Sequence, residues 1–197
     1  MNKLIVIVGV SGAGKTTLAN ALTKRGGFDL ALEQHSERPF QALFKQDPTY
    51  ALANQLDYLL YRAEQERELR AGDKPALMDG GLDLDFHGFT RLFHTRGWLN
   101  VAEFELCSRF YSLTRSLLPL PDLIVALNTS AQTITERLAS RARINIASSE
   151  DADMLARFIE EWLDSLSPER VLKLDTSREE KDYPQSIEAI LRRIETL

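Results

Sequence analysis

The residues with the clearest chemical potential lie near the N-terminus, where a glycine-rich turn ends in a lysine and a threonine. Gly9 and Gly14 enclose four residues, and Lys15 and Thr16 follow them, which is the phosphate-binding pattern G-x-x-x-x-G-K-[ST]. Glycines let successive backbone N–H groups turn toward an anion, and a following helix offers its positive end to the same anion. We therefore predict a nucleoside triphosphate site, with ATP as the donor, at Gly9, Ser11, Gly12, Ala13, Gly14, Lys15, Thr16 and Thr17.

Two oxygen-bearing side chains are candidates for holding Mg²⁺ beside these phosphates. The Thr16 hydroxyl can ligate the ion, while Lys15 is a candidate catalytic residue that reaches the β- and γ-phosphates. Asp79 ends a short apolar stretch, and an acid at such a strand end supports Mg²⁺ in enzymes with this loop. The alternative is an acid that caps the Gly80–Gly81 turn. The neighbouring loop favours the metal site.

Further charged residues have the chemistry of phosphoryl transfer. Glu33 ends a predicted strand and is a candidate general base, although an ordinary loop acid is the alternative. Arg137 and Arg141 lie one helical turn apart and Arg143 follows. Guanidinium groups can neutralise a phosphoryl group in flight, whereas a solvated basic face at a helix end is the alternative. Because flexible polar sequence follows, we expect a catalytic lid at about residues 137–152.

Alternating strands and helices must position these groups. Residues 33–49 contain Pro39 and Pro48 and are predicted to form a loop. The following helix, over about residues 50–69, carries an apolar stripe of Leu52, Leu56, Leu59, Leu60 and Ala63. Strands are predicted over residues 4–8, 28–33, 76–79, 123–127 and 171–174, and the other helices over residues 15–24, 82–95, 100–117, 130–141, 150–166 and from 184 onward. This order predicts an α/β fold, with a five-stranded parallel sheet between two layers of helices.

Composition limits the classes of protein to which the chain can belong. Its 197 residues fit a single domain, 1–197, and the net charge of −5 argues against nonspecific binding to nucleic acid or a membrane surface. Cys107 is the only cysteine, which excludes a disulfide framework. The apolar run at the N-terminus leads straight into the glycine-rich turn, so we interpret it as a strand rather than a signal peptide. A cytoplasmic enzyme is expected.

The order of motifs resembles the deoxynucleoside kinase family over nearly the whole chain. Glu33 followed by Arg38-Pro39-Phe40 and Phe44 resembles the family's strand-end glutamate and the stretch after it. Further similar stretches are Asp47-Pro48 through Gln55 to Arg62, Pro121 to Leu127, and the three arginines at 137, 141 and 143. The resemblance implies a P-loop kinase fold, transfer of the ATP γ-phosphate to a nucleoside 5′-hydroxyl, and a homodimer formed through helices of the middle segment.

The same resemblance implies roles for individual residues. Glu33 would accept the proton of the 5′-hydroxyl, and Gln55 and Arg62, seven residues apart on one helix face, would reach the edge of the base. Asp85 falls where the family recognises the base. Phe44 stands where many members place a tyrosine that contacts the sugar 3′-oxygen. These residues form the predicted acceptor site.

Departures from the family pattern concentrate in that acceptor site. Gly80 replaces the arginine that usually follows the strand-end acid, and Phe44 lacks the tyrosine hydroxyl. A nucleoside monophosphate kinase, or a kinase of another small hydroxylated molecule, is therefore an alternative. A nucleotide-binding regulatory module without acceptor phosphorylation is an alternative of another class. The aromatic residues between Phe86 and Phe110 are interpreted as core or dimer interface rather than as an acceptor cavity.

Overall fold

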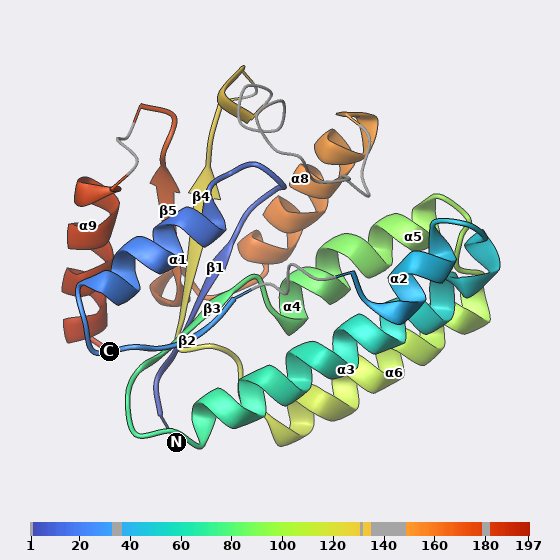
Figure 1. The fold of residues 1–197 in the computed structure, drawn as a ribbon, viewed down its shortest axis with the longest axis horizontal. Coiled ribbons are helices and arrows are strands. Elements are labelled where there is room, and N and C mark those ends of the chain that lie inside the picture. The colour runs from blue at the N-terminus through green and yellow to red at the C-terminus, as the bar shows by residue number, and fades with distance from the viewer. Residues whose placement is uncertain (1, 33–36, 131, 135–148, 179–181) are drawn as a thin grey trace.

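A five-stranded parallel sheet forms the centre of the computed structural model, which describes residues 2–32, 37–130, 132–134, 149–178 and 182–197 (Figure 1). The strands lie in the order β2-β3-β1-β4-β5, and every neighbouring pair is parallel. Their bounds are β1 (Leu4–Val8), β2 (Asp29–Ala31), β3 (Ala76–Asp79), β4 (Leu123–Asn128) and β5 (Val171–Asp175). The predicted sheet is confirmed, and its parallel strands place all their carboxyl ends at one edge.

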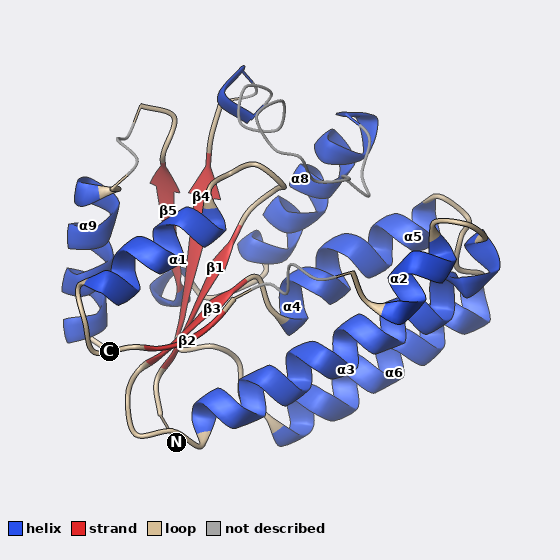
Figure 2. Ribbon diagram, viewed as in Figure 1, coloured by secondary structure: helices blue, strands red, loops and turns tan. Residues whose placement is uncertain are grey.

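Helices cover both faces of this sheet (Figure 2). Side chains alternate along a strand, so Ile5 and Ile7 of β1 pack with α1 (Lys15–Lys24) and α9 (Pro184–Glu195). Leu4 and Val6 point the other way and pack with α8 (Ser149–Asp164). The expected three-layer α/β/α arrangement is therefore confirmed.

A third group of helices packs beyond the α8 side of the sheet. Its long members, α3 (Ala51–Arg70) and α6 (Val101–Leu117), lie side by side in Figure 1 and enclose an aromatic core of Phe44, Phe86 and Phe93. This burial supports the interpretation of the aromatic residues as core. The shorter elements are α2 (Pro39–Phe44), η1 (Pro48–Tyr50), α4 (Leu82–Leu84), η2 (Asp85–Thr90), α5 (Arg91–Thr95) and η3 (Pro168–Arg170).

The predicted loop over residues 33–49 is wrong where α2 and η1 form. Both helical segments begin with the prolines that were interpreted as breakers, Pro39 and Pro48. Proline suits the first helical position because its missing N–H would have no partner there and its φ is already helical. The Gln41 side chain also accepts a hydrogen bond from the Arg38 N–H, which closes the first turn of α2. The prolines therefore start short helices.

The predicted apolar stripe on α3 is also wrong in part. Leu59 is fully buried, but Leu60 is 48% exposed. The buried face instead contains polar residues, namely Asn54, Gln55, Arg62, Glu66 and Arg70. Burying charge is costly unless an opposite charge compensates it, and α3 packs against segments that supply such charges. The buried side of α3 is therefore a polar interface.

The predicted single helix over residues 82–95 is divided into three segments. The middle one, η2, is a π-helical turn in which the Thr90 hydroxyl donates to the Asp85 carbonyl, five residues earlier. Such turns occur often at functional sites.

None of the helices in the described ranges is long and apolar enough to cross a membrane.

Candidate active site

The glycine-rich turn between β1 and α1 has the geometry of an anion-binding loop. Gly12 and Gly14 have φ values of +87° and +102°, a region that glycine adopts without strain. A Cβ at Gly9 would lie 2.9 Å from the Leu127 carbonyl oxygen, so this position also requires glycine. The Lys15 ammonium donates to the Gly9 carbonyl at 2.9 Å, which holds the cation against the loop.

Two threonines that sequence reasoning missed support this loop from the ends of β4 and β5. The buried Thr129 hydroxyl donates to the Ala13 carbonyl at 3.3 Å and lies 2.7 Å from the Thr176 hydroxyl. Thr176 in turn donates to the Asn128 carbonyl. The available signal was their position, because each directly follows a strand that ends at the ligand edge of the sheet.

Thr16 and Asp79, the predicted metal residues, lie in contact. The Thr16 hydroxyl donates to Asp79 Oδ2 at 2.5 Å, and the Asp79 side chain is buried at the end of β3. Both supply the hard oxygen atoms that Mg²⁺ prefers. The described residues contain no cluster of three acidic, histidine or cysteine side chains for a metal.

The structure brings three predicted acceptor residues together on α3 and η2. Arg62 is 2% exposed, and its Nε donates to Asp85 Oδ2 at 2.9 Å. The Thr90 hydroxyl donates to Gln55 Oε1 at 3.0 Å and to the Asp85 carbonyl. The π-helical turn thus connects Asp85 to Gln55 through Thr90, a residue that the sequence did not single out. Together these groups present hydrogen-bond donors beside a carboxylate.

Gly80, which departs from the family pattern, lies directly beside this cluster. A Cβ at position 80 would lie 3.1 Å from Arg62 Nη2, and the backbone there has φ +77°. A side chain would therefore crowd the guanidinium group as well as strain the backbone. Because position 80 is glycine, the Arg62 guanidinium from α3 can lie against the carboxyl end of β3.

Other predicted site residues have different surroundings or lie outside the described residues. Phe44 is buried and stacks on Phe93, with ring centroids 4.8 Å apart, and it meets Trp98 edge-on. The described end of the predicted lid, from residue 149, is the first turn of α8, where Asp151 pairs with Arg96 at 2.6 Å. The residues that lie outside the described ranges are Glu33, Arg137, Arg141 and Arg143.

A sequence model of the deoxynucleoside kinase family matches residues 5–197. The chain belongs to this family. This deoxynucleoside kinase is 24% identical to the deoxyadenosine/deoxycytidine kinase of Bacillus subtilis (strain 168) over 179 residues, covering 88% of this chain and 82% of the relative. It is 26% identical to the deoxyguanosine kinase of the same organism over 140 residues, which cover 71% of this chain and 67% of that relative.

Solved structures show the same fold for this deoxynucleoside kinase. The deoxyadenosine kinase from M. mycoides with bound dATP superposes with a TM-score of 0.79 at 21% identity, covering 98% of this chain and 99% of that chain. The form with bound dCTP gives a TM-score of 0.78 at 19% identity, covering 98% of this chain and 100% of that chain. The P-loop kinase fold is thus confirmed, as is the function: the enzyme phosphorylates a nucleoside with ATP. The regulatory-module alternative is wrong.

Proposed function

We propose that this kinase acts on 2′-deoxynucleosides whose base carries an exocyclic amino group. The buried Arg62–Asp85 pair beside Gln55 is the observation that supports this proposal. A carboxylate only accepts hydrogen bonds, whereas a guanidinium only donates them. A base edge that combines an amino group with a ring acceptor satisfies both, while the carbonyl oxygens of thymine would face Asp85 unfavourably. The names of the relatives, which include deoxyadenosine, deoxycytidine and deoxyguanosine kinases, agree with this chemistry.

The proposed mechanism divides the work between the loop, the strand ends and the arginines. Lys15 and the loop amides bind the triphosphate of ATP. Thr16 and Asp79 would hold Mg²⁺, which would supply positive charge to neutralise the phosphates. Glu33 accepts the proton of the 5′-hydroxyl. The negative charge on the transferring phosphoryl group is neutralised by Arg137, Arg141 and Arg143.

Phe44 has a different proposed role from the family tyrosine. Its ring stacks on Phe93 and has no hydrogen-bonding group. We propose that it shapes the wall of the acceptor site by packing. Contact with the 3′-oxygen must then come from other groups.

We also propose that the enzyme is a homodimer formed through α6. Leu106, Leu113 and Leu117 are spaced seven and four residues apart, so they share one helix face. They are 41%, 63% and 72% exposed, respectively. Adjacent exposed apolar side chains of this kind mark interaction surfaces. A cytoplasmic location stays a prediction.

Replacing Glu33 by Gln tests the assignment of the general base. Because general-base catalysis contributes about 10²- to 10⁴-fold, we expect kcat for the preferred deoxynucleoside to fall by at least about 100-fold. ATP affinity should change less than about twofold, because the phosphate loop is untouched. Turnover with deoxyadenosine, deoxycytidine, deoxyguanosine and thymidine is measured by release of ADP.

Glu37→Gln is the matched control, because Glu37 is an exposed acid paired with Lys45 shortly after Glu33 in the sequence. It should leave turnover unchanged. Full activity of Glu33→Gln would show that another group is the base. Preference for thymidine over the three amino-bearing nucleosides would contradict the proposed base specificity.

A further inference from the structure

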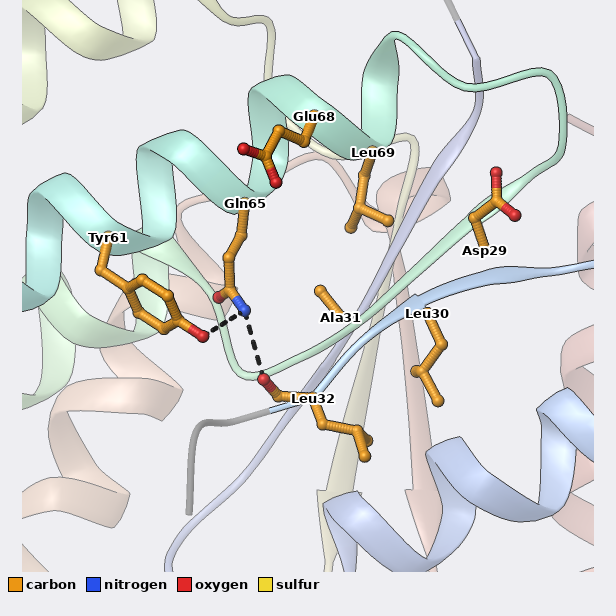
Figure 3. Close-up of a pocket in the computed structure, with 8 residues that line it drawn as sticks. All are labelled: Asp29, Leu30, Ala31, Leu32, Tyr61, Gln65, Glu68 and Leu69. Carbon is orange, nitrogen blue, oxygen red and sulfur yellow. Dashed lines mark hydrogen bonds between the residues drawn. The ribbon is translucent and has the colours of Figure 1, made fainter. Parts of the chain in front are cut away.

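A glutamine on α3 connects the acceptor arginine to the end of the edge strand β2. Gln65 Oε1 accepts a hydrogen bond from Arg62 Nη1 at 3.0 Å. Gln65 Nε2 donates to the Tyr61 hydroxyl at 2.8 Å and to the Leu32 carbonyl at 3.3 Å, as the dashed lines in Figure 3 show. Because a guanidinium only donates and a backbone carbonyl only accepts, these two partners determine the orientation of the amide.

Gln65 and two of its hydrogen-bond partners lie at the wall of a cavity. Gln65 lines a cavity of about 560 Å³ between α3 and β2, whose wall is drawn in Figure 3. The other lining residues are Asp29, Leu30, Ala31, Leu32, Tyr61, Glu68 and Leu69. Tyr61 and Leu32, which accept hydrogen bonds from the Gln65 amide, therefore form part of the same cavity wall.

The contacts of Gln65 extend through Arg62 to the other parts of the acceptor site. Arg62 also pairs with Asp85 on η2, and its Nη2 lies against Gly80 at the end of β3. One amide therefore links the ends of two strands and the π-helical turn. The residue that follows Leu32 in the sequence is Glu33, the proposed base.

We propose that Gln65 is a positioning residue for phosphoryl transfer. Its carbonyl oxygen sets the plane of the Arg62 guanidinium and thereby the contact with the base of the acceptor. Its amide N–H group bonds the Leu32 carbonyl and thereby holds the end of β2 at a set separation from Arg62. The kinetic effect of this positioning rests on the proposed function. The hydrogen bonds of Gln65 to Arg62 and Leu32 do not depend on it.

Two substitutions separate the two halves of this link. Gln65→Leu removes every hydrogen bond of the amide at similar volume. Gln65→Glu keeps an oxygen acceptor for Arg62, but it places a carboxylate oxygen opposite the Leu32 carbonyl, where no donor remains. The substitutions should therefore affect the acceptor KM and kcat differently.

The expected result is a split between these kinetic constants. Gln65→Leu should raise the acceptor KM and lower kcat, each by about tenfold, since misplacing a reacting group by about 1 Å costs up to about 100-fold. Gln65→Glu should lower kcat by about tenfold while the acceptor KM stays within about threefold. The KM for ATP should change less than about twofold in both variants.

Amide hydrogen exchange measures the link without turnover. Peptides that contain β2 should exchange faster in both variants than in the wild-type enzyme. Glu64→Gln is the matched control, because this neighbouring α3 side chain is exposed, and both its exchange and its kinetics should match the wild type.

Unchanged exchange of β2, or kinetic constants within twofold of the wild type, would overturn the proposal. Equal losses of ATP and acceptor affinity together with a lowered melting temperature would also overturn it, because they indicate a purely structural role. If the wild-type enzyme phosphorylates none of the four nucleosides, the proposed specificity fails, whereas the exchange measurement still decides whether Gln65 holds β2.

Discussion

At the scale of single residues, two buried acids belong to the two halves of the proposed site. Asp79 contacts Thr16 on the phosphate side, while Asp85 pairs with Arg62 on the acceptor side. The two acids have different partners, a hydroxyl in one case and a guanidinium in the other. The Thr16 hydroxyl brings no positive charge to Asp79, whereas the Arg62 guanidinium compensates the charge of Asp85.

Asp79→Asn should therefore weaken nucleotide binding only when Mg²⁺ is present. The asparagine preserves the shape of the side chain and removes its charge, so we expect ATP affinity in Mg²⁺ to fall by at least about tenfold, or about 1.4 kcal/mol. In EDTA the affinity should differ from the wild type by less than about threefold. Titration with a fluorescent ATP analogue measures both values.

Asp73→Asn serves as the control, since Asp73 is exposed in the turn before β3 and should bind nucleotide as the wild type does. An equal loss of affinity with and without Mg²⁺ would show that Asp79 supports the loop itself rather than the ion.

At the scale of elements, η2 is held between α6 and α8 by a half-buried histidine. His87 Nε2 lies 3.1 Å from the Tyr111 hydroxyl of α6, and its ring stacks on Trp162 of α8 with centroids 5.4 Å apart. The Tyr111 hydroxyl donates to Asp83 at 2.7 Å, so its oxygen can accept a hydrogen bond from the Nε2–H of a neutral imidazole. Burial, reinforced by the positive charges of Arg91 and Arg115, lowers the pKa of His87 to about 4.

This histidine should make the enzyme sensitive to acid. Because the pKa of His87 is 6.5 in the unfolded chain and about 4 in the folded one, unfolded molecules bind the additional proton between these values. Its contribution to stability is complete above pH 6.5 and is lost as the pH falls toward 4. The loss is on the order of 3 kcal/mol.

His87→Phe keeps a flat ring against Trp162 and removes the titrating group. The free energy of unfolding, measured by urea denaturation, should then depend less steeply on pH between about 4 and 6.5. Above pH 6.5 the variant and the wild type should show parallel pH dependence, which is the internal control. An unchanged slope below pH 6.5 would mean that His87 is not the group responsible.

At the scale of the whole molecule, α6 contacts the site region on one side and exposes leucines on the other. Its inward residue Arg115 pairs with Glu66 of α3 and with Asp83 of α4, both nearly fully buried. This network fixes α6 to α3, which carries Arg62, and to α4, which directly precedes Asp85. A second subunit docked on the exposed face would therefore brace the acceptor site from behind.

Leu113→Glu combined with Leu117→Glu should convert the proposed dimer to a monomer, because each carboxylate would be desolvated in an apolar interface. Light scattering after size exclusion should give twice the chain mass of 22.3 kDa for the wild type and the single mass for the double variant. Leu197→Glu, at an exposed apolar position at the C-terminus, is the control. A wild-type monomer would contradict the proposal.

The sequence alone determined the features that consecutive residues create. The phosphate loop, the bounds of α1 and the capping of α6 by Asn100 and Glu103 were all predictable, because each depends on backbone geometry and on partners within a few residues. Even the wrong loop at Pro39 was a local ambiguity, since proline both ends helices and begins them.

Only the tertiary structure decided which groups meet across the acceptor site. Gln65 bonds Leu32 across 33 positions of sequence, and Arg62 meets Asp85 across 23. The sequence predicted a leucine stripe as the buried face of α3, because the charges that allow its polar residues to be buried lie on other elements. In the sequence, Gly80 marked only the absence of the usual arginine. The structure shows that the Arg62 guanidinium from α3 lies beside this position.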